Sequence, residues 1–360
     1  MTAEHEGDGR PSRSRDRDDY LAVVAQSFAL GRLVHEDDLG TWGDRRRWRV
    51  RDERGRALLL KESPGYLSET DASAQEAIHC CLRDRGAPVV TLLRAVSGMG
   101  HASVHGRRVA LQTYAAGRPA DITDVGAIHR FGAALASLAV AGAGDRRWPA
   151  GDWSVPRSRL DLDPDAPVRL ARFVDRLDQH PRDGQHPDPS MLAELHRTAR
   201  SAAAFIEARA PLPAGFVHGD ANPFNCIDDG PAALSTLIDL DDARWAVQLF
   251  DLAQAIVHVA GVVRTSISGP AHIRGSWEPE PIETLLDGYE SARRLTAGER
   301  EALPHYVRLV TAAETVKAFE LELPQPQPPA DLAIQVARLS ALMRAPFPVT
   351  GRQLDSEEDT

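Results

Sequence analysis

Cysteine is scarce in this chain and is not arranged to crosslink it. Only three of the 360 residues are cysteines; Cys80 and Cys81 are adjacent, and Cys226 lies far away along the chain. This arrangement supplies neither a disulfide framework nor a C-x-x-C metal-binding pair. We therefore expect three free thiols.

Long apolar runs and a surplus of positive charge are also missing. No run approaches the roughly 20 apolar residues that cross a bilayer, and the N-terminal residues are charged where a signal peptide needs an apolar stretch. The net charge of −10 has the wrong sign for a protein whose main partner is nucleic acid. We expect a cytoplasmic protein with no membrane or nucleic-acid partner, and the negative charge is compatible with a cationic substrate.

Lysine and asparagine are rare, and their positions are informative. The chain has 40 arginines but only two lysines, Lys61 and Lys317, and only two asparagines, Asn222 and Asn225. A lysine within a predicted strand indicates a site that needs a compact ammonium in place of the planar guanidinium that the chain otherwise prefers. Because both asparagines fall within four residues of each other, that stretch is a candidate for chemistry.

The order of apolar patterns predicts two lobes. Short β-rich runs, one helix and two further strands around VTLLRA and RRVALQTY make residues 19–114 an α+β lobe. A segment containing Gly and Pro, 115–120, is predicted to be a hinge, and 121–349 is dominated by helical patterns. The polar ends of the chain lack apolar periodicity, so 1–18 and the acidic 350–360 are predicted to be disordered tails.

The second lobe is not entirely helical. A short β-like stretch lies between Phe216 and Leu240. We found no internal repeat. The predicted helices are 122–143, 166–180, 189–209, 247–263, 280–292, 297–323 and 330–345.

The β-like stretch carries the residues with the clearest chemistry. The sequence FVHGDANPFNCIDDGPAALSTLIDLDDAR places Asp220 five residues before Asn225, and Asp239 at the end of an apolar run. Phosphoryl transfer to a hydroxyl needs a carboxylate near the accepting oxygen, and it needs oxygen ligands that hold Mg²⁺ against nucleotide phosphates. Asp220 suits the first role, and Asn225 and Asp239 suit the second. The structural alternative for each residue is an ordinary turn position, where Asp and Asn are common.

The motif H-G-D-x-x-x-x-N, followed by I-D and then by D-L-A, resembles the signature of the aminoglycoside phosphotransferase and choline kinase-like family, relatives of the protein kinases. The resemblance extends from about residue 33 to about residue 342. It implies an α+β, bilobal protein kinase-like fold with a small N-terminal lobe, built from an antiparallel sheet and one main helix, and a larger, mostly helical C-terminal lobe. It also implies that ATP and Mg²⁺ are the cofactors.

The same resemblance assigns roles within the motif. Asp220 corresponds to the catalytic-loop aspartate, Asn225 and Asp239 to the metal ligands, and Asp251 to the helix residue that braces the catalytic loop. We expect His218 to be a packed side chain that supports the loop and not a catalyst.

The resemblance places the nucleotide's phosphates beside Lys61, at the end of RALLLKE. An ion-pair partner for Lys61 is expected from the following helix, and Glu76 is favoured over Glu69 because it falls inside the helical pattern. The structural alternative for Lys61 is a surface lysine on an edge strand.

Other nucleotide contacts are implied by position. A loop that covers the phosphates is expected at Gly40 to Gly43, although a simple hairpin also needs glycines. The adenine would contact the carbonyl of Thr113 and the N–H of Ala115.

By the resemblance, the acceptor binds among the helices that follow the hinge, near 145–190 and 262–290. An apolar platform there could be formed by Trp148, Trp153 and Trp277. A cationic acceptor could be bound by Glu278, Glu280 and Glu283. A helix N-terminus also collects acidic residues because of its dipole, which is the structural alternative for these glutamates.

The predicted function is ATP-dependent phosphorylation of a hydroxyl on a small molecule: an aminoglycoside, another antibiotic or a biosynthetic intermediate. The LIDLDDAR stretch also resembles the stress-response kinases of this group, so a Ser/Thr protein kinase is an alternative, as is a kinase of homoserine or choline. An alternative of another class is a nucleotide-binding pseudokinase, which the intact Lys61, Asp220, Asn225 and Asp239 disfavour.

The chain lacks a Walker A motif, which disfavours a P-loop fold. The sequence leaves the oligomeric state open.

Overall fold

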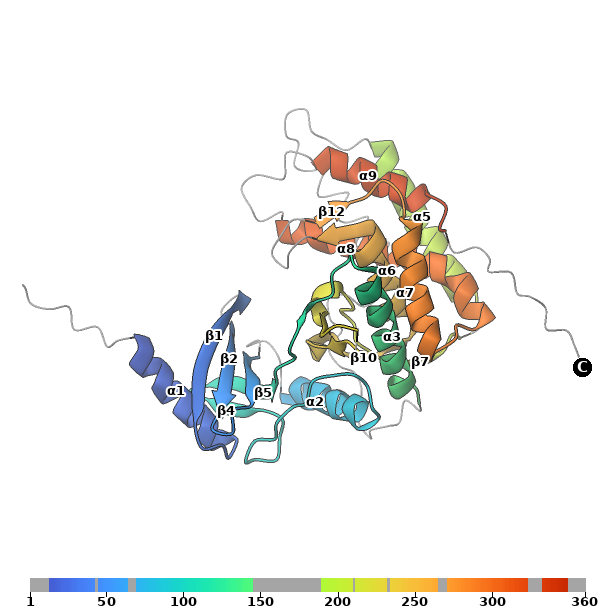
Figure 1. Cartoon of the computed structure of the whole chain (residues 1–360). Coiled ribbons are helices and arrows are strands. Elements are labelled where there is room, and N and C mark those ends of the chain that lie inside the picture. The colour runs from blue at the N-terminus through green and yellow to red at the C-terminus, as the bar shows by residue number, and fades with distance from the viewer. Residues whose placement is uncertain are drawn as a thin grey trace, which may run out of the picture. The chain divides into compact units, whose positions relative to one another are not determined.

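The structure is a computed structural model of the chain (Figure 1). It describes residues 13–42, 45–63, 69–144, 189–209, 211–231, 234–264, 271–322 and 332–348. The chain divides into two compact units: the first is Met1–Cys80 with Val90–Ala115, and the second is Cys81–Val89 with Ala116–Thr360. The division after Ala115 falls within the segment predicted to be a hinge.

The first unit is built on a five-stranded antiparallel sheet in the order β1-β2-β3-β5-β4. Its strands are β1 (Leu33–Trp42), β2 (Arg45–Asp52), β3 (Ala57–Glu62), β4 (Ala102–Val104) and β5 (Arg107–Thr113). Since β3 pairs with β2 on one side and with β5 on the other, it is the central strand of the sheet.

A helix that precedes the sheet, α1 (Arg13–Ser27), buries its apolar stripe in the core of this unit. Full burial of one such aliphatic or aromatic side chain contributes about 1.5–3 kcal/mol. The helix begins at Arg13, so the tail predicted to reach residue 18 overlaps its first turns. The core joins helix and sheet through Tyr20, Leu21, Val24, Phe28, Val50, Leu58, Leu60, Val109 and Leu111.

One predicted strand lies elsewhere. The fifth strand of the sheet is β4, whereas the VTLLRA run contacts β5 only through separate backbone hydrogen bonds, such as Leu93 N–H to Leu111 O at 2.8 Å and Thr113 N–H to Thr91 O at 2.8 Å. β4 pairs with Arg107–Val109, so the run lies farther along the same strand, where it forms an isolated bridge between Leu92 and Gln112 and no continuous ladder. Between β3 and this run lies α2 (Glu69–Asp84), whose last residues belong to the second unit.

The second unit is mainly helical. The predicted helix at 166–180 lies outside the described residues. The described helices are α3 (Val125–Gly142), α5 (Pro189–Glu207), α6 (Leu249–Ile256) with a π-helical continuation at Val257–Gly261, α7 (Pro279–Ala292), α8 (Ala297–Glu322) and α9 (Leu332–Arg344).

Two glycines allow α3 and α7 to pack closely (Figure 1). A Cβ on Gly132 would lie 2.1 Å from the carbonyl oxygen of Leu285, and one on Gly288 would lie 2.0 Å from the carbonyl oxygen of His129. By length and composition α3 could cross a membrane, but a buried core helix has the same composition, and most of α3 is buried in this unit.

Short strands position the predicted catalytic stretch. They form three small sheets in the orders β6-β8-β9, β10-β7 and β11-β12, and the pairs in them are antiparallel. The catalytic stretch passes through β7, β8, β9 and β10 and then enters α6. The strands are β6 (Arg118–Pro119), β7 (Ala214–Val217), β8 (Cys226–Asp228), β9 (Thr236–Leu237), β10 (Arg244–Val247), β11 (Val262–Arg264) and β12 (Ala271–Ile273).

Candidate active site

The loop between β7 and β8 brings Asp220 and Asn225 into direct contact. Asn225 Nδ2 donates to Asp220 Oδ2 at 2.8 Å and to the Asp220 carbonyl at 3.0 Å. Asn225 is 6% exposed, whereas Asp220 is half-buried. The amide nitrogen of Asn225 is therefore used within the loop, which leaves its Oδ1 as the oxygen that can bind a ligand.

The other asparagine has a structural role. Asn222 Oδ1 accepts hydrogen bonds from the N–H groups of Phe224 (3.0 Å) and Asn225 (3.2 Å), so it caps the 3₁₀ turn Pro223–Asn225. The cap supports the turn that ends in Asn225. The two asparagines of the chain thus divide into one that shapes the loop and one that faces Asp220.

Asp239 is placed beside the same loop by the pairing of β8 with β9. In this pairing Cys226 lies opposite Leu237, and the N–H of Ile238 donates to the carbonyl of Asn225 at 2.9 Å. The backbone of Asp239 is left-handed, with φ 62° and ψ 57°. Such a conformation is uncommon outside glycine and costs free energy, and residues that adopt it concentrate at functional sites.

His218 joins the two parts of this site. Its Nε2 lies 2.8 Å from the carbonyl of Ile238, and its Nδ1 accepts the N–H of Asp220 at 3.3 Å. Nε2 must carry the proton, because a carbonyl oxygen can only accept. Both ring nitrogens are therefore used to fix the backbone on either side of the site, which is the supporting role predicted for His218.

The glycine of the H-G-D motif is required by its geometry. Gly219 has φ +82°, and a Cβ there would lie 2.1 Å from the carbonyl oxygen of Asp242. Any other residue would be strained and would push the loop away from that carbonyl.

Two side chains of α6 hold the backbone of the catalytic loop. Asp251, 4% exposed, accepts the N–H of His218 on Oδ2 (2.6 Å) and the N–H of Gly219 on Oδ1 (2.9 Å). Gln254, one turn later, accepts the N–H of Ala221 on Oε1 at 2.7 Å. Burial raises the pKa of the Asp251 carboxyl, while the two N–H donors act in the opposite direction.

The support from Asp251 was predicted, whereas Gln254 was missed. The signal available in the sequence is its spacing, because residues i and i+3 lie on the same face of a helix. Both side chains therefore point toward the loop that contains Asp220.

A second support was also missed. Arg130 on α3 makes two bonds of 2.6 Å to Asp228 at the end of β8, and Ser235 Oγ donates to Asp228 at 3.2 Å. The guanidinium holds the pKa of Asp228 below its ordinary value. The residues are 98 positions apart in sequence, so no local pattern could reveal the pair. It fixes β8, which follows directly from Asn225.

Lys61 does not lie on an edge strand. It sits in the central strand β3, opposite Arg47 of β2 and Ala110 of β5, and is 8% exposed. The structural alternative, a surface lysine on an edge, is therefore wrong.

Glu76, the expected partner of Lys61, contacts other side chains. On α2 its Oε1 accepts from Arg94 Nη1 at 3.2 Å, and its Oε2 lies 3.6 Å from His101 Nδ1. The Glu76 side chain is 11% exposed. In this structure, the carboxylate assigned to Lys61 by family resemblance is thus engaged by Arg94 and His101, which arrive from the segment after α2.

The remaining predicted nucleotide contacts lie in the first unit. Gly40 lies within β1, where the pairing with β2 is irregular, and has φ +87°; Gly43 lies outside the described residues. Thr113 ends β5, and its hydroxyl accepts the N–H of Thr91 at 2.9 Å. In the described part of the chain no residue accepts the N–H of Ala115.

Two of the predicted acceptor residues, Trp277 and Glu278, are engaged by neighbouring side chains. Trp277 is 6% exposed and packs edge-on against Phe347, with ring centroids 5.7 Å apart, so its ring offers no open platform. Glu278 forms an ion pair with Arg274. Glu280 is exposed in the first turn of α7. Two predicted platform residues, Trp148 and Trp153, lie outside the described residues.

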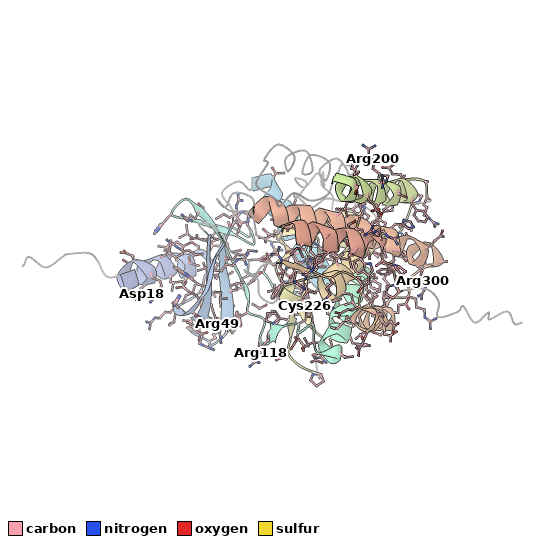
Figure 2. The ribbon with its side chains drawn as sticks, turned by 90° about the horizontal axis from the view of Figure 1, so that it is seen from above. Asp18, Arg49, Arg118, Arg200, Cys226 and Arg300 are labelled. Atoms are coloured by element: carbon pink, nitrogen blue, oxygen red, sulfur yellow. The ribbon has the colours of Figure 1, made fainter. Side chains whose placement is uncertain are left out.

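The three cysteines are free thiols, as predicted. Cys226 directly follows Asn225 and is fully buried within the second unit (Figure 2). Burial raises the pKa of its thiol to about 12. It therefore acts as a small apolar side chain behind the loop and not as a nucleophile.

The donor set suits a hard cation. Asn225 and Asp239 offer an amide and a carboxylate oxygen, the ligand type of Mg²⁺ and Ca²⁺. Among the described residues no cluster of three or more His, Cys, Asp or Glu side chains could hold a metal alone. Such a cation would therefore complete its shell with water and nucleotide phosphates, as Mg²⁺ usually does in phosphotransferases.

Comparison with known proteins identifies the family. The family described as "Phosphotransferase enzyme family" matches residues 40–304, and the chain belongs to it. The members of this family are phosphotransferases.

Particular relatives agree with this assignment. A homoserine kinase of Gluconacetobacter diazotrophicus is 29% identical over 225 residues, and the match spans 62% of each chain. An aminoglycoside phosphotransferase of Alicyclobacillus acidocaldarius has a similar structure, with a TM-score of 0.60 at 20% identity over 89% of this chain and 92% of that one. An amicoumacin kinase, solved with AMP-PNP and Ca²⁺, has a TM-score of 0.59 at 15% identity over 92% and 95%. These structures confirm the predicted α+β, bilobal kinase-like fold.

Proposed function

We propose that the chain transfers the γ-phosphoryl group of ATP, as its Mg²⁺ complex, to a hydroxyl of a small hydroxylated amine. The observation that carries this proposal is the contact between Asp220 and Asn225 in a loop that also adjoins Asp239. One carboxylate is thereby available to a hydroxyl, and two oxygen ligands lie next to it.

The chemistry assigns a separate task to each residue. Asp220 orients the acceptor hydroxyl and takes its proton. The hydroxyl oxygen forms a bond to the γ-phosphorus as the bond between that phosphorus and the β–γ bridging oxygen breaks, and ADP leaves. Asn225 Nδ2 holds Asp220 Oδ2, so Oδ1 is the oxygen available to the hydroxyl. Asn225 Oδ1 and the carboxylate of Asp239 would hold Mg²⁺, which neutralises charge on the phosphates when bound. We assign Lys61 to the phosphates of the nucleotide, where a compact ammonium is an effective point charge.

The relatives and the net charge support an amine-bearing acceptor. Homoserine and the aminoglycosides, which the names of two relatives contain, are both hydroxylated amines. The net charge of −10 favours the approach of a cation. Homoserine is the second, more specific candidate, because a homoserine kinase is similar in sequence as well as in function class.

The test is a screen for ADP release. Full-length protein with MgATP would be given homoserine, amino alcohols, aminoglycosides, nucleoside antibiotics and Ser/Thr peptides, with the Asp220→Asn variant as the control. We expect acceptor-dependent ADP release with at least one hydroxylated amine and none with the variant.

Other outcomes separate the alternatives. Turnover with peptides alone would contradict the small-molecule assignment. Binding of MgATP without turnover on any acceptor would support a pseudokinase. Failure to bind MgATP, seen as no rise in the melting temperature, would refute the nucleotide assignment itself, because a ligand that binds only the folded state must stabilise it.

A further inference from the structure

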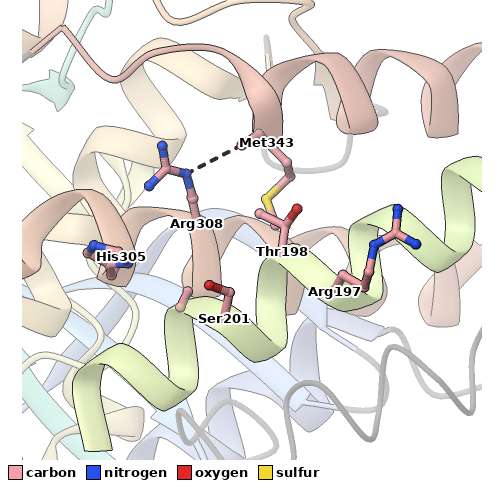
Figure 3. A pocket seen from close by; sticks show the side chains of 7 residues that line it. Arg197, Thr198, Ser201, His305, Arg308 and Met343 are labelled. Carbon is pink, nitrogen blue, oxygen red and sulfur yellow. Dashed lines mark hydrogen bonds between the residues drawn. The ribbon is translucent and has the colours of Figure 1, made fainter. Parts of the chain in front are cut away.

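The second unit contains a pocket that none of the catalytic residues lines. It is an open pocket of about 360 Å³ between α5, α8 and α9 (Figure 3). Of the described residues that line it, none is acidic. The polar side chains in its lining are Arg197, Thr198, Ser201, His305 and Arg308.

The polar side chains come from two helix faces that meet at the pocket. On α5, Thr198 and Ser201 are three residues apart and Arg197 is four residues from Ser201, so the three share one face. On α8, His305 and Arg308 are likewise three residues apart. The sequence therefore directs guanidinium, imidazole and hydroxyl groups from two elements into one space.

Arg308 lacks the carboxylate partner that Arg130 and Arg293, two other half-buried arginines of this unit, have. Arg130 and Arg293 form ion pairs of 2.6 and 2.7 Å, the latter with Glu299. Arg308 is half-buried, but within the described chain it has no ion-pair partner, and its Nε donates to the carbonyl of Met343 at 3.3 Å. Burial without a counter-charge lowers the pKa of Arg308. A half-buried cation without a counter-charge is stabilised when an anion binds next to it.

The surroundings of His305 indicate the same positive potential. Its ring stacks on Phe205, with centroids 3.6 Å apart, which fixes its orientation at the pocket. Burial, followed by the positive charges of Arg308 and Arg209, lowers the pKa of His305. The charge of Arg209 is itself matched by Glu301, so of these two cations it is Arg308 that has no carboxylate partner in the described part of the chain.

We propose that this pocket binds a phosphate group, either inorganic phosphate or the phosphate of a small metabolite. Two guanidinium groups with two hydroxyls suit a tetrahedral dianion, because they can donate to its oxygens from different directions. The volume lies at the lower end of the range of about 300–1,000 Å³ for small-molecule sites, so it accommodates a phosphorylated metabolite.

The test measures phosphate binding to the full chain by calorimetry. Inorganic phosphate, glycerol 3-phosphate and succinate would be titrated separately, each with saturating Mg²⁺ and AMP-PNP to occupy the nucleotide site. We expect saturable binding of a phosphate probe that is tighter than that of succinate. The two phosphate probes distinguish the free ion from a phosphorylated metabolite.

Three variants locate the binding. Arg308→Gln should weaken it by about 10- to 100-fold, the worth of one hydrogen bond to a charged group. Arg197→Gln, at an exposed position where folding is not at risk, should weaken it several-fold. Arg200→Gln lies on the same helix, outside the pocket, and should leave it unchanged.

Three results would overturn the proposal. They are the absence of saturable phosphate binding, binding that survives both pocket substitutions, and an equal loss in Arg200→Gln, which would indicate only a general effect of charge.

Discussion

Replacing Asp251 with asparagine tests whether the catalytic loop is held in place from α6. Asp251 accepts two loop N–H groups, from His218 and Gly219, with separate carboxylate oxygens. A carboxamide has one acceptor oxygen, so Asp251→Asn leaves one buried N–H facing an NH₂ group. Gln254 still holds the N–H of Ala221, so the loop loses its first anchor and keeps its second.

The size of the effect follows from these bonds. An unpaired buried N–H costs about 1–3 kcal/mol, and removal of a buried charge offsets part of that cost. We expect the free energy of unfolding to fall by about 2 kcal/mol, which corresponds to a decrease of roughly 4–8 °C in Tm. Because Asp220 directly follows the released N–H of Gly219, we expect kcat to fall by about 10²-fold, as for a reacting group displaced by an ångström.

The assay combines thermal unfolding with steady-state kinetics on the acceptor found by the screen. Asp229→Asn is the matched control, because Asp229 is an exposed acid just after β8 and braces nothing in the loop. The control should behave as wild type. If Asp251→Asn left both Tm and kcat unchanged, the claim that Asp251 holds the catalytic loop would be refuted. A lower Tm with an unchanged kcat would show that Asp251 stabilises the fold but does not position Asp220.

Three further predictions concern the packing and ionisation of the second unit. Gly288→Ala places a methyl group 2.0 Å from a carbonyl oxygen of α3, so we expect a loss of about 1–3 kcal/mol in urea unfolding, and a wild-type midpoint would contradict the close packing. Because Arg130 holds the pKa of Asp228 below its ordinary value, their pair stabilises the fold above the unfolded pKa and loses this effect as pH falls through the folded pKa. Asp228→Asn should therefore be less stable than wild type at about pH 7, with a difference that shrinks toward about pH 3; a difference independent of pH would count against the ion pair. With the thiol pKa raised to about 12 by burial, Cys226 should resist alkylation in the folded protein while the half-buried Cys80 reacts, as mass spectrometry of the labelled peptides would show.

The local features of the site could be predicted from the sequence. The spacing of Asp220, Asn225 and Asp239 predicted phosphoryl transfer, and the segment between Phe216 and Leu240 was predicted to be β-like, because these features lie in one continuous stretch. His218 and Asp251, predicted to support the loop, make hydrogen bonds to its backbone. Most helices followed from apolar periodicity, since each buries one face.

The features that were missed depend on contacts between distant parts of the chain. Arg130 meets Asp228, and Glu76 meets Arg94 and His101, through packing that no local pattern encodes. A similar limit applies to the VTLLRA run: an apolar run indicates burial, but the sequence does not show whether it forms a continuous ladder or, as here, an isolated bridge to β5.

The prediction that Trp277 forms part of an open platform was wrong for a related reason. A tryptophan in a sequence reads equally well as a platform or as core, and Trp277 is core. Its ring also lies against the position of Gly261, where an added Cβ would be 2.6 Å from a ring carbon. Only the packed structure distinguishes the two readings.

The most direct test of the central claim compares Asp220→Asn with Asp239→Asn across a titration of Mg²⁺. If Asp220 takes the hydroxyl proton, its variant should lose about 10²- to 10⁴-fold in kcat and still bind MgATP nearly as wild type. If Asp239 holds the metal, its variant should lose nucleotide affinity as well as turnover, and added Mg²⁺ should restore part of both in that variant alone. Identical behaviour of the two variants, or wild-type turnover by Asp220→Asn, would contradict the assignment.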